Sequence, residues 1–492
     1  MDHYYIGIDM GTSAIKAVLI DNTCSILHSE EEEYQLSCPH PGWKEIDPEL
    51  WYKAAVRALG RLLAEIDRSQ VSCIGITGQM HTLTVLDSRG LPVRPAMQWN
   101  DARTEQMLPH LREQLRKFKN APYLARIIST GSPAVNLLWL REYEPEHFAR
   151  IEKFLIGPDY LVYRFCGNCS TDFCEASTSS LYDLYHLRWS EEMRDLVGLR
   201  GSQYPHVRGS AQAAGRIRPE LAQNLGLPET VRILVGTGDN PAAAISTGCL
   251  TGGYPVLSLG TSGVLISTRS KIDFQAKGKN ILYSTDGKDI YPMVQGVIQS
   301  GGGTLSWWTR EILEDGDFSF LDHQLALDKG SNDQLLFYPH IAGEKTIHRD
   351  LDIRGAFLGL SGGTTRNDMS RAVMEGICFA FRELIEAMKV TWQTGEKVKI
   401  TGGGSKSRVW LQLFADILNA DVEQMECTGG AAYGAALLAM HASHQDLSLQ
   451  QLAQHSVKIR AVFHPQVEKT KWYNQQYQRY LRIYPALREI WH

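Results

Sequence analysis

The stretch Ile8–Asp21, IDMGTSAIKAVLID, indicates two strands rich in β-branched residues that are joined by a Gly-Thr-Ser turn, the pattern of a β-hairpin. The same turn recurs in Leu257–Thr268, LSLGTSGVLIST, about half of the 492-residue chain further on. A repeat at half the chain length predicts two similar halves, each of which presents one glycine turn to a shared ligand.

The sequence around these hairpins indicates helices packed on mixed sheets. We expect a third strand over His28–Leu36, a helix over Pro48–Ile66 and a buried strand over Val71–Gly78. In the second half, the expected elements after the hairpin are a helix, a strand, a helix and a Gly/Ala-rich helix, over 369–388, 398–405, 408–418 and 429–442. The chain is too long for one core, so we predict an α/β protein with domains 1–247 and 248–492 and a cleft between them.

The bulk composition argues against several classes of protein. The net charge is −5 and the pI about 6.4, so an electrostatic nucleic-acid binder is not expected. No run of about 18 apolar residues predicts a membrane span, and the N-terminus lacks the pattern of a signal peptide. The nine cysteines do not suggest a disulfide framework. We therefore expect a cytoplasmic protein of enzyme size.

Three cysteines, Cys166, Cys169 and Cys174, lie close together in FCGNCSTDFC. The first two have the spacing of a zinc site, but no matching second pair follows them. Reduced, packed cysteines are the better interpretation.

The first Gly-Thr-Ser turn has the composition of a phosphate site. Gly11 lets backbone N–H groups approach an anion, Thr12 and Ser13 add hydroxyl donors, and Lys16 adds a cation. Asp9 precedes them, where its carboxylate could hold a magnesium ion through water. The alternative is a tight hairpin whose glycine and threonine serve only the turn.

Two further glycine turns extend this pattern. The second hairpin repeats the donors with Gly260, Thr261 and Ser262, but it has Ser258 at the position of the aspartate. A third cluster lies between an expected strand and helix, and it consists of Gly402, Gly403, Gly404 and Ser405. Such a turn leaves room for a flat base or a ribose against the backbone. One carboxylate and two sets of donors suit a nucleotide held from both halves.

At this point the chain resembles a known family. The motifs DMGTSAIK, GTGDN, SLGTSG and TGGGSKS, in this order and spacing, are similar to those of the FGGY carbohydrate kinases of the actin-like ATPase superfamily. The resemblance spans nearly the whole chain and includes the segment Gly355–Gly376. Within the family, GQMH (Gly78–His81), WNDAR (Trp99–Arg103) and PHPGWKEIDPELWY are most similar to xylulokinases.

The resemblance implies two actin-like (ribonuclease H-like) domains that close over ATP, Mg²⁺ and a sugar. It also implies that Asp239, in the GDN motif, is the general base that takes a proton from the attacking sugar hydroxyl. The alternative for Asp239 is an ordinary Gly-Asp-Asn turn.

The resemblance further implies a set of sugar-binding residues, with His81 offering a hydrogen bond and Met80 an adaptable apolar wall. The full set comprises Gln79, Met80, His81, Trp99, Asn100, Asp101 and Arg103. The alternative for His81 is a packing residue at the end of a strand.

Four positions depart from the family pattern, and they bear on the substrate. Asn136 stands where a lysine is usual, Lys345 and Ile347 replace the arginine and proline of a Gly-Glu-Arg-x-Pro motif, and Thr82 replaces a glycine. We therefore expect a kinase for a small sugar, with ketopentoses such as xylulose first. Other ketoses, pentitols and sugar acids such as gluconate stay open.

A second hypothesis is a non-catalytic ATP-binding protein of the same fold. The presence of Asp239 speaks against it, because a nucleotide switch needs no base for a sugar. A homodimer is compatible with the family, and the aromatic-rich tail could pack on a neighbour or on its own domain.

Overall fold

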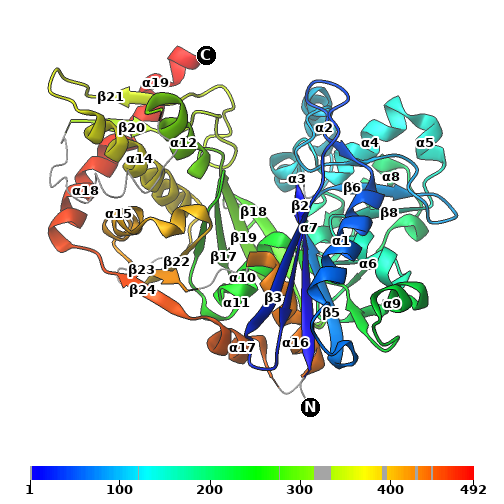
Figure 1. Cartoon of the computed structure of the whole chain (residues 1–492). Coiled ribbons are helices and arrows are strands. Elements are labelled where there is room, and N and C mark those ends of the chain that lie inside the picture. Colours follow the sequence, from blue (N-terminus) through cyan, green and yellow to red (C-terminus); the bar gives the residue numbers. More distant parts are fainter. Residues whose placement is uncertain are drawn as a thin grey trace.

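Two seven-stranded mixed sheets, one in each half of the chain, form the centres of two lobes (Figure 1). The computed structural model describes residues 3–119, 121–275, 277–314, 334–390, 396–426, 430–444 and 447–492. The first sheet has the order β13-β14-β5-β1-β2-β3, with β15 paired to β5, and the second has the order β18-β19-β17-β16-β22-β23-β24. The predicted α/β class with two similar sheets is confirmed.

The strands of the first sheet are β1 (Tyr4–Met10), β2 (Ala14–Ile20), β3 (Ile26–Glu33), β5 (Val71–Gly78), β13 (Ala213–Arg216), β14 (Arg232–Leu234) and β15 (Thr237–Gly238). Those of the second are β16 (Val256–Leu259), β17 (Gly263–Thr268), β18 (Lys279–Tyr283), β19 (Tyr291–Ile298), β22 (Lys397–Thr401), β23 (Asp421–Met425) and β24 (Ile459–Phe463). The helices that concern the site are α1 (Pro48–Leu62), α4 (Pro133–Tyr143), α7 (Phe173–Thr178), α10 (Asp239–Ser246), α12 (Gly302–Trp307), α14 (Arg366–Ala387), α15 (Arg408–Leu418) and α16 (Gly430–Ser443).

Both expected hairpins are present. In the first, β1 pairs with β2 in an antiparallel register that sets Asp9 opposite Lys16. In the second, β16 pairs with β17 and Leu259 lies opposite Gly263. The two Gly-Thr-Ser turns are therefore the loops of equivalent hairpins in the two lobes.

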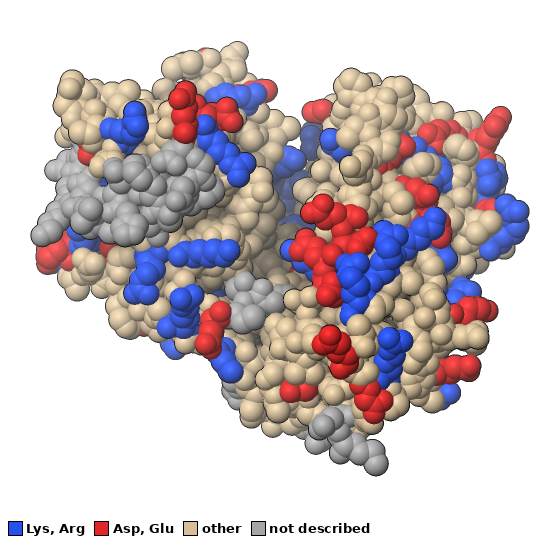
Figure 2. All heavy atoms as spheres, viewed as in Figure 1, with Lys and Arg blue, Asp and Glu red and all other residues tan. Residues whose placement is uncertain are grey.

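Helix α1 begins where the sequence predicts and ends at Leu62 instead of Ile66. Asp47 caps it by accepting a 3.0 Å hydrogen bond from the backbone N–H of Glu49. The acidic edge strand β3 runs beside this helix, where Arg61 pairs with Glu30 and Glu32, each at 2.7 Å. These pairs explain the four-glutamate run as a solvated strand edge, and Figure 2 shows acidic and basic side chains mixed on the surface of this lobe.

The parallel strands of each sheet bring their carboxyl ends to one edge. In the first sheet, β5 lies between β1 and β15 and parallel to both, with Gly78 opposite Met10 and Gly238. In the second sheet, β22 lies between β16 and β23 and parallel to both, with Thr401 opposite Ser258. Because ligands of α/β sheets bind at the carboxyl ends of the strands, these two edges are where a site is expected.

Helix α16 comes from the second half of the chain but packs on the first sheet and on α10 (Figure 1). Its backbone approaches so closely that a Cβ atom added to Gly7 would lie 1.9 Å from the carbonyl oxygen of Ala432. A Cβ atom added to Gly434 would likewise lie 1.9 Å from the carbonyl oxygen of Ala242. The close approach expected of a Gly/Ala-rich helix is therefore present, and it joins the two halves. The division into 1–247 and 248–492 stays a prediction.

Two expectations from composition can be compared with the described part of the chain. Cys166, Cys169 and Cys174 are free there. No helix of that part combines the length and the apolar surface needed to cross a membrane.

Candidate active site

Three motifs meet at the carboxyl edge of the first sheet. The Gly-Thr-Ser turn follows β1, residues Gln79–His81 follow β5, and Asp239 follows β15. The backbone N–H of Gln79 donates to the carbonyl oxygen of Met10 at 2.9 Å, and the Asn240 amide lies 3.3 Å from the sulfur of Met80. The sheet thus gathers the predicted phosphate turn, sugar residues and base, which lie far apart in the sequence.

Asp9 and Asp239 are neighbouring carboxyl groups in this cluster. Burial raises the pKa of Asp239 to about 7, and the charge of Asp9 raises it as well. Burial raises the pKa of Asp9 to about 6, against the opposing influence of Lys16. Oδ1 of each carboxyl is buried and has no hydrogen-bond partner among the described residues.

This donor set fits a hard cation. Asp9 and Asp239 influence each other electrostatically, so they repel when both are ionised, and an added cation relieves that repulsion. Carboxylate oxygens are the ligands that Mg²⁺ takes in proteins. Lys16 lies opposite Asp9 on β2, and its exposed Nζ is 3.7 Å from the carboxylate of Glu31.

Hydrogen bonds hold the first Gly-Thr-Ser turn in place. The N–H of Gly11 donates to the carbonyl oxygen of Ala14 at 3.0 Å, and the Tyr34 hydroxyl donates to the carbonyl oxygen of Gly11. The Thr12 hydroxyl accepts a 3.2 Å hydrogen bond from the indole N–H of Trp99. The predicted phosphate turn therefore touches the predicted sugar loop directly.

The second Gly-Thr-Ser turn packs against a glycine triplet that the sequence analysis did not single out. Gly302 and Gly303 donate backbone hydrogen bonds, each of 2.8 Å, to the carbonyl oxygens of Gly260 and Thr261. A Cβ atom on Gly302 would lie 2.6 Å from the carbonyl oxygen of Gly260. The signal was the run SGGGT (300–304), whose last three residues begin the short helix α12; only glycine lets this helix start approach the turn so closely.

The third glycine cluster borders a cavity of about 370 Å³ in the second lobe. Gly402 has φ +84°, and a Cβ atom there would lie 2.7 Å from the carbonyl oxygen of Leu259, so the fold itself requires glycine at this position. Gly403 is exposed, and a Cβ atom there would meet nothing within 4 Å. The cavity is lined by Gly402, Ser405, Lys406, Arg408, Gln424, Met425, Glu426 and Arg460. Lys406 and Arg408 directly follow the glycine cluster, whereas Gln424, Met425, Glu426 and Arg460 come from β23, its end and β24, which sequence spacing could not place.

Figure 2 shows a groove between the two lobes. Trp99 and Asn100 are exposed, with Trp99 at 44% of its full exposure. Thr82, one of the departures from the family pattern, is buried below them and accepts a hydrogen bond of 3.3 Å from the backbone N–H of Trp99. The departure thus supports the loop that carries the exposed indole.

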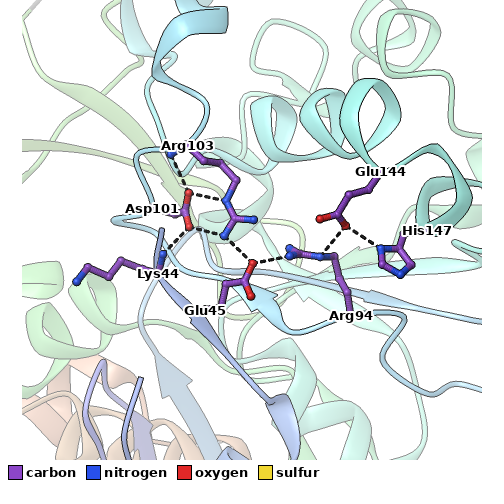
Figure 3. Close-up of polar contacts among 7 residues, drawn as sticks. All are labelled: Lys44, Glu45, Arg94, Asp101, Arg103, Glu144 and His147. Atoms are coloured by element: carbon purple, nitrogen blue, oxygen red, sulfur yellow. Dashed lines mark hydrogen bonds and ion pairs between the residues drawn. The ribbon is translucent and has the colours of Figure 1, made fainter. Parts of the chain in front are cut away.

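Asp101 and Arg103 lie in a buried ion-pair network beneath that loop (Figure 3). Nη2 of Arg103 is 2.7 Å from both Asp101 and Glu45, and its guanidinium stacks 3.7 Å from the ring centre of Trp43. The network continues through Arg94 to Glu144 at 2.9 Å. Nη1 of Arg103 has no hydrogen-bond partner in the described part of the chain.

These contacts indicate that Asp101 and Arg103 stabilise the loop that carries Trp99. The backbone N–H of Lys44 donates to Asp101 Oδ2 at 2.6 Å, so Asp101 ties the loop to the segment before β4 (Glu45–Ile46) as well. Most polar atoms of both side chains are hydrogen-bonded or ion-paired to other protein groups. Their proposed contact with the sugar stays a prediction.

His81 adopts a strained backbone conformation at the end of β5, with φ +71°. Its N–H donates to Oε2 of Glu175 at 3.2 Å, and its Nε2 lies 3.2 Å from Nζ of Lys279. Burial holds the pKa of His81 well below its usual range, and the charge of Lys279 lowers it further. The sequence analysis missed Glu175 and Lys279, because no local pattern marks either residue.

Gln79 and Asn136 are buried amides whose side-chain atoms lack hydrogen-bond partners among the residues described. Asn136 lies on α4. Lys345 is exposed and Ile347 is buried beside Glu344, whose carboxylate accepts backbone hydrogen bonds from residues 346–349. The Lys345 and Ile347 departures therefore lie in a turn organised by Glu344.

Comparisons with known proteins agree with this geometry. Residues 4–246 match the model of the FGGY family of carbohydrate kinases, N-terminal domain, and residues 256–443 match that of the C-terminal domain. The xylulose kinase of Staphylococcus xylosus is 31% identical over 98% of this chain and 99% of that protein.

Two solved structures are similar over nearly the full length. A structure described as a "xyloylose kinase" from Brucella ovis has a TM-score of 0.91 and 31% identity, covering 99% of this chain and 100% of that one. The gluconate kinase of Lactobacillus acidophilus has a TM-score of 0.89 and 27% identity, covering 99% of this chain and 98% of that one.

Proposed function

The chain belongs to the FGGY family of carbohydrate kinases, and from this premise we propose that it transfers the γ-phosphoryl group of ATP to a hydroxyl of a ketopentose such as xylulose. One observation carries the catalytic part of the proposal. Asp239 and Asp9 stand together at the carboxyl ends of parallel strands, next to the first Gly-Thr-Ser turn, each with a buried and unpartnered Oδ1 within the described residues.

Asp239 serves as the general base. A carboxylate whose pKa is raised to about 7 accepts a proton more readily than an ordinary aspartate, and it is still largely ionised just above neutral pH. It takes the proton of the sugar hydroxyl as the hydroxyl oxygen attacks the γ-phosphorus and the bond to the β,γ-bridging oxygen breaks. ADP leaves, and the proton stays on the Asp239 carboxyl until it passes to solvent.

The glycine turns bind and orient ATP. Backbone N–H groups and the hydroxyls of Thr12, Ser13, Thr261 and Ser262 supply donors from the two lobes to the phosphates. The cavity beside Gly402–Ser405 takes the base and ribose. Asp9 would hold Mg²⁺, which neutralises phosphate charge when it is bound.

Sugar recognition rests on the loop after β5 and on Trp99. Met80 gives an apolar wall that Asn240 contacts, and His81 offers a ring N–H group. A relative and a structural neighbour that are named as kinases of xylulose support a ketopentose. The gluconate kinase of Lactobacillus acidophilus keeps a sugar acid as the second candidate. We place the protein in the cytoplasm, as expected from the sequence, and a homodimer stays a prediction.

The test is ADP release from magnesium-ATP in the presence of ketoses, pentitols and gluconate, with mass spectrometry of each product. The proposal expects one phosphorylated ketopentose at a rate far above that of the other compounds. Phosphorylation of gluconate instead would move the substrate to the second candidate. ATP binding without any phosphorylated product would contradict the proposal and favour a regulatory protein of this fold.

A further inference from the structure

A lysine of the second lobe reaches the sugar residues of the first. Lys279 is the first residue of β18, an edge strand of the second sheet, and β18 packs against α7 of the first half. Its Nζ lies 3.2 Å from Nε2 of His81 and 3.3 Å from the carbonyl oxygen of Thr178 at the end of α7. Among the described residues, its hydrogen bonds reach neither Gly-Thr-Ser turn, so the proposed phosphate chemistry gives this lysine no role.

The contact with His81 has a fixed direction. A lysine ammonium carries three donors and no acceptor, so Nε2 of His81 must present a lone pair. A neutral imidazole has one protonated nitrogen, so the proton must lie on Nδ1. That Nδ1–H is buried and has no acceptor among the described residues.

The surroundings of Lys279 keep it in the donor form. Burial lowers the pKa of Lys279 to about 8, and the neighbouring carboxyl group of Glu175 on α7 opposes that shift. The ammonium form therefore predominates at neutral pH. The Thr178 carbonyl oxygen accepts from the same ammonium and anchors its position.

We propose that Lys279 is a positioning residue for the acceptor sugar, which acts by fixing His81 as the Nδ1–H tautomer. The proposal rests on the function proposed above, because it takes the sugar to be the partner of His81. The free donor at Nδ1 is aimed at an oxygen that accepts, such as the carbonyl oxygen of a ketose or the lone pair of a hydroxyl. An unpaired buried N–H is costly, so a sugar oxygen that meets it is bound more tightly.

In this arrangement, both lobes contribute residues to the sugar site. His81 comes from the end of β5 in the first sheet, and the group that sets its tautomer comes from β18 in the second. Glu175 completes the set by accepting the backbone N–H of the same histidine. A change at Lys279 therefore acts on sugar binding without touching a residue of the phosphate turns.

The experiment compares three variants with the wild-type protein. Lys279→Met removes the donor and keeps the length of the side chain. Lys279→Gln keeps an N–H donor without the charge. Lys277→Met is the matched control, because Lys277 is two residues away and donates instead to the carbonyl oxygen of Ile347 at 3.0 Å.

The first readout is the tautomer of His81. In ¹⁵N-histidine-labelled protein, the couplings between the ring nitrogens and the carbon-bound protons distinguish the two tautomers, and the His81→Gln spectrum assigns the signal. The wild-type and Lys277→Met proteins are expected to show Nδ1–H. Lys279→Met is expected to lose this preference, and Lys279→Gln to retain it at least in part.

The second readout is kinetic. Lys279→Met is expected to raise KM for the sugar about tenfold, with kcat and KM for ATP nearly unchanged, because one ground-state hydrogen bond is misdirected. Lys279→Gln should recover part of this loss. A purely structural role would give no rescue by glutamine and would leave the tautomer as it is in the wild type.

The proposal is overturned if His81 is the Nε2–H tautomer in the wild type, or if Lys279→Met leaves both the tautomer and the sugar KM unchanged. The tautomer is measured without any substrate. A protein that phosphorylates no sugar would therefore refute the proposed function while the tautomer experiment still reports on Lys279.

Discussion

The indole Nε1 of Trp99 lies 3.2 Å from Oγ1 of Thr12, so the predicted sugar loop and the predicted phosphate turn are joined by one hydrogen bond. A threonine hydroxyl that accepts from an indole still has its own proton to donate onward. Under the proposed function, Trp99 orients the Thr12 hydroxyl toward a phosphate, while Trp99 itself stays 44% exposed.

Trp99→Phe removes this donor and keeps an aromatic ring. We expect kcat/KM for the sugar to fall about three- to tenfold, as for the loss of one neutral hydrogen bond, with little change in apparent Tm. Thr12→Val and the double variant complete a double-mutant cycle. The effects of the two substitutions on kcat/KM should not be additive, because both remove the same hydrogen bond. Trp189→Phe is the control, because that indole donates to the carbonyl oxygen of Pro205 instead. Strict additivity would show that the hydrogen bond has no part in catalysis.

The pH dependence should report the ionisation of Asp239. A base must be deprotonated to act, so kcat/KM for the sugar should rise with pH and level off above an apparent pKa of about 7. Initial rates measured from about pH 5 to about pH 9 give this profile. A flat profile across neutral pH would contradict this environment for Asp239.

The same carboxyl predicts an effect on stability in magnesium-free buffer. Its pKa is raised from 3.8 to about 7, so the folded state binds the proton more tightly than the unfolded state. The stability that this group contributes is present at low pH and is lost as the pH rises through about 7. Asp239→Asn should therefore raise the free energy of unfolding near pH 7 by about 1–3 kcal/mol. Thermal melts of both proteins across pH test this, and a less stable variant would refute it.

Asp9→Asn should weaken the use of magnesium. The carboxylate that would hold the ion is lost, so at saturating ATP the Mg²⁺ concentration for half-maximal rate should rise about tenfold or more. Glu31→Gln is the control, because Glu31 is an exposed neighbouring carboxylate that pairs with Lys16. Equal magnesium requirements in Asp9→Asn and the wild type would exclude Asp9 as a ligand.

Two helical glycines test the packing between the halves of the chain. A Cβ atom at Gly434 would lie 1.9 Å from a backbone oxygen of α10, so Gly434→Ala should destabilise the protein by about 1–3 kcal/mol. Gly60 lies in α1 and a Cβ atom there would meet nothing within 4 Å, so Gly60→Ala should stabilise it by about 0.5–1 kcal/mol. Thermal and urea unfolding measure the expected loss of stability in Gly434→Ala and the expected gain in Gly60→Ala. A tolerated Gly434→Ala would contradict the close packing of α16.

Gly403→Ala separates nucleotide contact from folding. The protein itself leaves room for a methyl group there, so apparent Tm should stay the same. If the backbone at Gly403 borders the base or ribose, KM for ATP should rise severalfold. Gly362→Ala, which also meets nothing within 4 Å, is the control and should leave KM for ATP unchanged. An unchanged KM in Gly403→Ala would remove this glycine from the nucleotide site.

Local patterns were enough to predict the hairpins and α1. The alternation of β-branched residues around Gly11 and the capping by Asp47 act over a few residues, and the structure contains both. The elements against which α16 packs could not be predicted in the same way. Its small side chains indicated a close approach, but only the packed structure identifies β1, β5 and α10 as its neighbours.

The candidate site was also predicted only in part. The resemblance of the motifs to the family implied one site for Asp9 and Asp239, and in the structure both follow or lie on parallel strands that end at the same edge. The same motifs suggested Arg103 as a sugar residue, whereas in the structure its Nη2 pairs with Glu45, which is 58 positions away. Lys279 was missed because its partner lies in the other lobe, where no local sequence pattern could point to it.

The most direct test of this account is a single-turnover measurement of phosphoryl transfer from magnesium-ATP to xylulose by the wild type and by Asp239→Asn. The affinity of both proteins for ATP is measured by calorimetry on the same samples. We predict transfer in the wild type, a loss of about 10²–10⁴-fold in the variant and similar ATP affinities, as expected when a general base is removed. Phosphorylated sugar formed equally fast by Asp239→Asn would contradict the assignment of the base on which the proposed mechanism depends.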